Sequence, residues 1–250
     1  MSESPARRRS GILAPTVFTI CNVAILIGLG LWQLDRKVWK ENLIATLTMR
    51  FDHAPETLPS RAGWPQLLPA ASEYIRVAFP AEFLDGEEAL VYTAGSPLRP
   101  DVKGPGYWVF APAELAGGGI VLVNRGFVNL DRKDVSTRPE GVPHGKIEIT
   151  GVMRWPETRG LFTPADDVAH NVWYLRDLKA IATAKKWATA APFYIDQEAP
   201  MPEGGWPKPG KLTVTLPNNH LQYAITWFGL ALALAGVYIA WLAGRLRRRG

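Results

Sequence analysis

Two stretches of the chain carry no charged residue and stand apart from the sequence between them. The first runs from Gly11 to Leu34 and the second from Leu221 to Leu242. As a helix, each is long enough to cross the roughly 30 Å hydrocarbon core of a bilayer. The pattern therefore predicts two transmembrane helices, at residues 12–34 and 220–242, flanking a domain of ordinary globular composition at residues 35–219.

A cleaved signal peptide is the alternative interpretation of the first stretch, because Arg7, Arg8 and Arg9 precede it as a basic leader would. The apolar run is longer than the roughly 7–15 residues usual for a signal peptide, and no small-x-small cleavage motif ends it. We therefore predict an uncleaved membrane anchor.

Basic residues near the span ends predict the orientation. Residues 1–11 and 243–250 are both rich in arginine, which marks the cytoplasmic side of a membrane. Arg36, Lys37 and Lys40 follow the first span and oppose this assignment, but the agreement of the two tails outweighs them. The short amino tail does not resemble a transit peptide, so we predict a bacterial inner (cell) membrane with a periplasmic domain. The net charge of +5 reflects this anchoring and does not indicate nucleic-acid binding.

The segment between the spans has mostly the residue pattern of β-strands. The first helix is predicted to continue to about Thr48, and apolar residues then alternate with polar ones from residue 73. Further β-rich runs lie at 89–96, at 106–130 around a triple glycine, at 145–155, at 191–196 and at 211–217. One amphipathic helix is predicted after Asp177, its N-cap, with Leu178 and Ile181 buried. Together they predict an α+β domain with a mostly antiparallel, barrel-like sheet.

The chain lacks the common signatures of catalysis and metal binding. Its only cysteine is Cys21, inside the first span, so the exported domain has neither a disulfide nor a thiolate metal site. No CxxC, HExxH, GxSxG or phosphate-loop motif is present, and the four histidines are scattered. The carboxylates of Asp166 and Asp167 are predicted to lie in a solvated turn. We predict that the protein is not an enzyme.

Candidate binding residues gather at the membrane borders. His220, Tyr223 and Trp227 follow one another at i, i+3 and i+7, and so share a face of the second span. Imidazole is the usual axial ligand of haem iron, which makes His220 a candidate iron ligand. Trp32, near the end of the first span, and Arg36, just after it, are further candidates. An aromatic belt at the lipid headgroups explains the tryptophans without a ligand, and both interpretations stay open.

Small residues also line one face of the second span and permit close approach of another helix. They are Gly229, Ala233, Gly236 and Ala240, and Gly28 and Gly30 offer a similar surface on the first span. The two spans are therefore expected to pair with each other or with the helices of a partner.

Four motifs stand in order over about residues 25–240: GLWQLDRKVWKENLI, GYWVFAPAEL…GGGIVLVNRGFV, NVWYLRDL and GGWPKPGKLTVTLPNNHLQYAITWFGLA. They resemble the signatures of the Surfeit locus protein 1 family, the cytochrome c oxidase assembly factors. One departure is VAFPAEF, where the family more often has a glycine before the phenylalanine. It touches a turn and not the candidate site.

The resemblance implies a non-enzymatic role, in which the protein helps haem a reach oxidase subunit I, with haem a synthase as a further partner. In bacterial members the histidine at the start of the second span is linked to haem a binding, and here that position is His220. We expect tryptophan or tyrosine rings to stack on the haem and Arg36 or Lys37 to meet its propionates. Arg125 is a second candidate for the propionates, with a structural ion pair as its alternative. The alternative function is a scaffold without haem, which would stabilise nascent subunit I through transmembrane helix contacts.

Overall fold

The computed structural model describes residues 11–248, apart from residues 85, 142, 188–189 and 215–216. The predicted amino-terminal tail, with Arg7, Arg8 and Arg9, lies outside the described residues except for Gly11, and so does Arg249 of the carboxyl tail. The chain forms two compact units. We call Met1–Ile44 with Pro217–Gly250 the helical unit and Ala45–Leu216 the β-rich unit.

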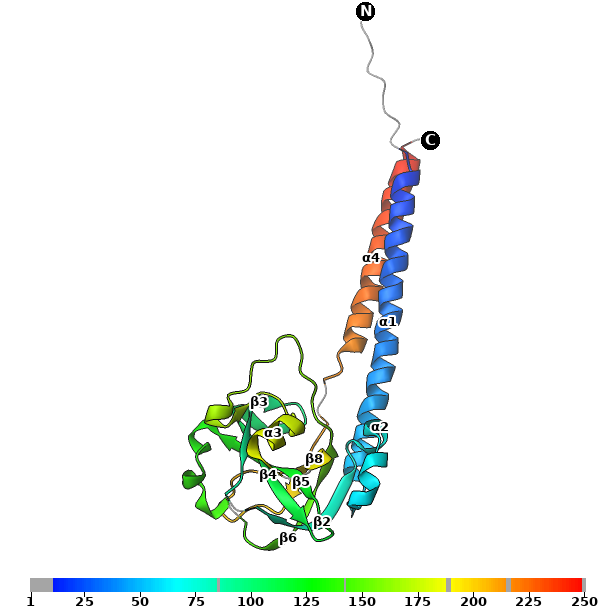
Figure 1. Ribbon diagram of the computed structural model, residues 1–250. Coiled ribbons are helices and arrows are strands. Elements are labelled where there is room, and N and C mark those ends of the chain that lie inside the picture. The colour runs from blue at the N-terminus through cyan, green and yellow to red at the C-terminus, as the bar shows by residue number, and fades with distance from the viewer. Residues whose placement is uncertain (1–10, 85, 142, 188–189, 215–216, 249–250) are drawn as a thin grey trace, which may run out of the picture. The chain divides into compact units, whose positions relative to one another are not determined.

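The helical unit is built from two long helices (Figure 1). Helix α1 spans Leu13–Asp52, of which the part up to Ile44 belongs to this unit, and helix α4 spans His220–Arg247. Both are long and apolar enough to cross a membrane. Two apolar helices are thus found where the spans were predicted, and α1 continues without a break a little beyond Thr48.

The two helices of this unit pair in antiparallel fashion. Thr16 of α1 hydrogen-bonds the Tyr238 hydroxyl near the end of α4, whereas Gln33 of α1 contacts His220 at its start. Close approach occurs at Gly30, where an added Cβ would lie 2.5 Å from a ring carbon of Phe228. Three small residues of the two helices are also buried: Thr19, Ala224 and Ala231.

The predicted small-residue face of the second span is not the face that contacts α1. An added Cβ on Gly229 or Gly236 would meet nothing within 4 Å among the described residues, and the same holds for Gly28. Gly229 is two residues from the buried Ala231, which places it about 200° around the helix axis. Pairing of the two spans is therefore confirmed at Gly30, whereas Gly28 and the stripe at 229–240 point away from the contact, and their pairing with a partner's helices stays a prediction.

The close contact at Gly30 yields a first prediction. Gly30→Leu should force the helices apart, because overpacking a tight contact costs about 1–3 kcal/mol. Thiols placed by Thr16→Cys and Tyr238→Cys, with the native thiol removed by Cys21→Ser, report the pairing through the yield of a short thiol crosslinker in membranes. We expect the yield to fall several-fold with Gly30→Leu and to stay unchanged with Gly28→Leu. An equal yield from both variants would contradict the observed pairing.

The β-rich unit contains a single eight-stranded sheet. Its strands are β1 (Glu56–Thr57), β2 (Arg76–Phe83), β3 (Ala89–Ser96), β4 (Arg99–Leu115), β5 (Ile120–Asn129), β6 (Lys146–Arg154), β7 (Val172–Trp173) and β8 (Ala190–Ala199). Two short α-helices, α2 (Pro69–Ser72) and α3 (Leu178–Lys185), accompany it, with 3-10 turns at Arg61–Gln66, Leu130–Arg132, Val135–Thr137, Pro139–Gly141 and Val168–His170.

The strand order is β1-β2-β6-β8-β5-β4-β3-β7, with an additional pairing between β2 and β4. Three of the pairings, β1–β2, β3–β7 and β5–β8, are parallel. The sheet is therefore mixed, and the expectation of a mostly antiparallel sheet was wrong, whereas its barrel-like closure stays a prediction. The reason is topological: β8 returns beside β5 after β6 and α3, so it runs parallel to β5 and antiparallel to β6.

Both faces of the central strands are covered. In β5 every residue except Asn129 is buried. A strand with one solvated face would instead alternate buried and exposed side chains. One apolar cluster includes Phe79, Val121 and Phe193, and a second, on the side of α3, includes Trp108 and Ile181. The predicted cap of α3 is confirmed, because the Asp177 carboxylate accepts from the Ala180 backbone N–H at 3.0 Å.

One predicted strand is wrong. Residues 211–214 lie outside any strand, and 215–216 are not described. The Thr213 backbone N–H donates to the Leu98 carbonyl at 2.9 Å without forming a ladder. The apolar alternation of this segment instead places Leu212 in the interior.

Candidate functional site

The border histidine has a defined partner in the helical unit. His220 is the first residue of α4, and its Nδ1 lies 2.7 Å from Oε1 of Gln33 on α1. A carboxamide oxygen can only accept a hydrogen bond, so Nδ1 carries the proton. In the neutral imidazole, Nε2 then carries the lone pair. Metal-binding histidines commonly have this arrangement, with one nitrogen anchored to an oxygen and the other left to ligate.

The other predicted aromatic residues make no described interaction with this pair. Tyr223 and Trp32 are more than half exposed on the outer surfaces of their helices. Trp227 is half-buried, one turn beyond Ala224 on the contact face. The structure therefore brings together His220 and Gln33, and sequence reasoning missed Gln33. Its one available signal was an uncharged polar side chain near the end of an apolar stretch.

Cationic side chains follow Gln33 along α1. The Arg36 guanidinium lies over the Trp39 ring, 4.3 Å from its centroid. Lys37 pairs with Glu41 at 2.7 Å, and Lys40 donates to the backbone carbonyl of Pro217, just before α4. Arg36 therefore presents a charge beside an exposed indole, whereas Lys37 and Lys40 are already engaged.

Arg125 lies in the β-rich unit and is buried. Its Nη1 is 3.0 Å from Glu88 Oε1, and the same carboxylate is 2.5 Å from Arg138 Nη2. Arg125 also donates to the backbone carbonyl of Gly141. Burial, only partly offset by Glu88, lowers the pKa of Arg125 to about 10. Arg125 thus forms the structural ion pair that was its alternative interpretation.

The paired aspartates are committed to loop structure, as expected for a turn. Asp166 pairs with Arg159, and its other oxygen accepts from the Tyr174 backbone N–H at 2.9 Å. Asp167 caps the turn before His170. Among the described residues, no group of three or more His, Cys, Asp or Glu side chains is placed to hold a metal ion.

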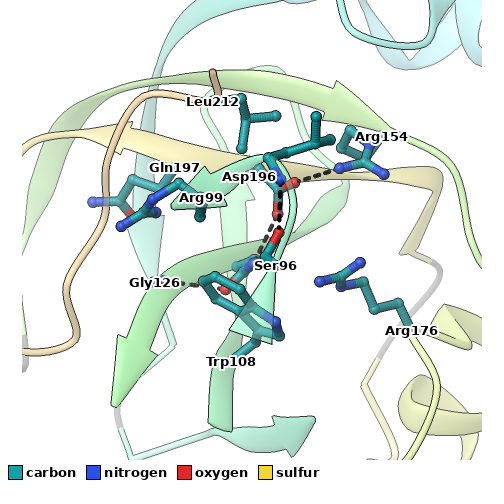
Figure 2. Close-up of a pocket in the computed structure, with 11 residues that line it drawn as sticks. Ser96, Arg99, Trp108, Gly126, Arg154, Arg176, Asp196, Gln197 and Leu212 are labelled. Carbon is teal, nitrogen blue, oxygen red and sulfur yellow. Dashed lines mark hydrogen bonds and ion pairs between the residues drawn. The ribbon is translucent and has the colours of Figure 1, made fainter. Parts of the chain in front are cut away.

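A second polar site lies in the β-rich unit (Figure 2). This arginine pocket is a cavity of about 20 Å³. We define it by Arg99, Trp108, Asn124, Arg154, Arg176 and Asp196. Asp196 is held by Asn124 Nδ2 at 2.7 Å and by Arg154 Nη1 at 2.9 Å. Arg99 is held by Asp101, and this hydrogen bond keeps the pKa of that carboxyl at about 2.

Two buried donors in this pocket lack a partner among the described residues: Trp108 Nε1 and Arg176 Nε. A buried donor left without an acceptor costs about 1–3 kcal/mol. Unsatisfied groups of this kind mark places where a water or a ligand completes the structure.

Comparison with known proteins places these residues in context. The sequence model described as the SURF1 family matches residues 20–232. The chain belongs to the SURF1 family.

Similar SURF1-family proteins come from distant organisms. A SURF1-like protein of Monosiga brevicollis is 33% identical, covering 100% of this chain and 93% of the relative. Surfeit locus protein 1 of Takifugu rubripes is 34% identical, covering 89% and 95%, and that of Homo sapiens is 36% identical, covering 82% and 70%.

The stretches that resemble the SURF1 family meet at the two sites. Gln33 belongs to GLWQL and His220 to NNHLQ, so the first and last motifs come together in the helical unit. Trp108 and Arg176 belong to GYWVF and NVWYLRDL, so the middle motifs meet in the arginine pocket.

Proposed function

We propose that this protein is a cytochrome c oxidase assembly factor that binds haem a at the membrane border and aids its insertion into oxidase subunit I. Membership of the SURF1 family supports the assembly role. The observation that carries haem binding is the hydrogen bond from His220 Nδ1 to Gln33, because it leaves the lone pair of Nε2 for iron.

The residues present fit a haem that must later be released. A single histidine anchored by a neutral carboxamide is a less basic ligand than one anchored by a carboxylate, so it holds iron less firmly. Exposed apolar rings at Trp32 and Tyr223, together with Trp227, offer stacking surfaces for a porphyrin. Arg36 offers a guanidinium for a propionate. The chain's own task is to bind, orient and release this cargo, and no catalytic step is required.

The two apolar helices support a membrane setting. We propose that both cross a bacterial inner membrane, with the tails in the cytoplasm and the β-rich unit in the periplasm. Haem a is then taken up near the lipid headgroups, with haem a synthase as its source and the bilayer as a constant partner.

One observation favours the scaffold as a second candidate function. The small-residue stripe at 229–240 points away from α1, so it is available to a helix of nascent subunit I. A scaffold of this kind needs no haem. Oxidase assembly that depends on the stripe but not on His220 would support it.

The direct test is the optical spectrum of protein purified from cells that make haem a. The proposal predicts a bound haem with the pyridine haemochrome spectrum of haem a. Protein that is folded, expressed beside an active haem a synthase and free of haem would contradict it.

The role given to Gln33 leads to a further prediction. Gln33→Leu should weaken haem binding about 10–100-fold, the usual cost of losing the group that orients a ligating histidine. Gln33→Glu should retain haem at a lower midpoint potential, because a carboxylate makes the imidazole a stronger donor. Haem titration and redox potentiometry measure these effects, with the exposed Gln222→Leu as control. Wild-type affinity and potential in both Gln33 variants would remove Gln33 from the site.

A further inference from the structure

The arginine pocket plays no part in the proposed handling of haem, yet its polar groups converge (Figure 2). Arg99 and Trp108 come from β4, Asn124 from β5, Arg154 from β6 and Asp196 from β8. Arg176 reaches in from the loop before α3 toward the side of the view where Trp108 and Asp196 lie. A cavity of about 20 Å³ has room for one or two oxygen atoms.

Two donors in this pocket determine what can enter. Trp108 is 3% exposed, and its Nε1 has no hydrogen-bond partner among the described residues. Arg176 donates from Nη1 to Glu157 at 2.8 Å, while its Nε is likewise buried and unpartnered. Indole and guanidinium nitrogens donate and never accept. Whatever fills the space must therefore be an acceptor.

One of the two unpartnered donors is charged, which favours an anion over a neutral acceptor. Three arginines and one carboxylate, that of Asp196, line the pocket. Asp196 already accepts from Asn124 and Arg154, one at each oxygen. The guanidinium carbons of Arg99 and Arg176 lie 5.8 and 5.7 Å from the Trp108 ring centroid. Asp101 and Glu157 pair with Arg99 and Arg176 and balance much of their charge. Arg176 Nε remains an unpartnered charged donor, and an anionic acceptor gives it a stronger hydrogen bond than a neutral one.

A third unpartnered atom is an acceptor, Oε1 of Gln197. In Figure 2 Gln197 lies on the opposite side of Asp196 from Arg176. A water molecule can donate to Oε1 there without occupying the space between Trp108 and Arg176.

We propose that the arginine pocket binds one carboxylate group, which accepts from Trp108 Nε1 with one oxygen and from Arg176 Nε with the other. A carboxylate supplies two acceptor oxygens and a negative charge, which matches two donors of which one is charged. A single water offers one oxygen and no charge. The carboxylate belongs either to a small free acid or to a polypeptide terminus, and the proposal is independent of haem.

The test is a titration of the full-length chain, in detergent micelles, followed by the indole N–H resonances. Sodium acetate is the probe, and sodium chloride at equal ionic strength and neutral acetamide are the controls. One indole resonance, assigned to Trp108 by its loss in Trp108→Phe, should move downfield and saturate with acetate only. Arg176→Gln should keep that resonance and weaken acetate binding about tenfold or more, because a charge-assisted hydrogen bond is lost.

Further arms separate the sources and the alternatives. N-acetylglycine mimics a polypeptide terminus, so a response equal to that of acetate assigns the pocket to a terminus, and exclusion assigns it to a small free acid. If Trp108→Phe fails to fold, the resonance that loses its response in Arg176→Gln identifies the site. An equal response to acetamide, or no response to acetate beyond that to chloride, shows a water site and overturns the proposal.

Discussion

Purified His220→Ala protein should contain haem only at background level, whereas the wild type should contain haem at a constant molar ratio to protein. The physical reason is that His220 Nε2 supplies the bond to iron, and alanine offers no donor. Stacking and a propionate contact at Arg36 would remain, but neither replaces the coordinate bond. Pyridine haemochrome assay of protein purified from cells making haem a gives the ratio.

The matched control is His53→Ala, because His53 is exposed in the β-rich unit and serves no proposed role at the membrane border. Circular dichroism establishes that both variants are folded. Oxidase from cells carrying His220→Ala should also be depleted in haem a. His220→Ala protein that retains the wild-type haem-to-protein ratio and spectrum would show that His220 is not the iron ligand. Normal oxidase beside haem-free His220→Ala protein would favour the scaffold.

Glu88→Ala should lower the free energy of unfolding of the β-rich unit by about 3–5 kcal/mol, the typical cost of removing one partner from a buried ion pair. Glu88 is 8% exposed, and its carboxylate is shared by the buried guanidinium groups of Arg125 and Arg138. Without it, two like charges remain in the interior and repel each other.

Denaturant unfolding of the full chain, followed by tryptophan fluorescence, measures this loss. The control is Glu148→Ala, an exposed position on β6 where a change within about 0.5 kcal/mol is expected. Equal unfolding free energies for the two variants would show that the Glu88 carboxylate does not hold the two arginines together.

The apolar helices could be predicted from sequence because composition alone identifies an uncharged run of this length. The strands could be located because alternation reports which side chains face inward, as for Val77 and Phe79. No comparable sequence pattern indicates whether two strands pair in a parallel or an antiparallel direction. The parallel neighbours β5 and β8 are separated by β6 and α3, so their direction depends on the path of the chain.

The candidate site was predictable only in part for the same reason. His220 could be recognised from its own position, at the start of an apolar helix. Its partner Gln33 is 187 residues away, and nothing local to either residue indicates that α1 and α4 pair on this face. Likewise, Trp108 and Arg176 become candidates only because separate elements bring them to the lining of one cavity and leave a nitrogen of each without a partner.

Resonance Raman spectroscopy of haem-loaded protein, with and without ¹⁵N-histidine, tests directly whether His220 binds the iron. The ferrous wild type should show an iron–nitrogen stretching band that shifts to lower frequency with the heavier isotope, and Gln33→Glu should raise the frequency of that band. His220→Ala, reconstituted with the same haem, should lack the band. An iron–nitrogen band that persists in His220→Ala, or haem-loaded wild type without any isotope-sensitive band, would contradict ligation by His220.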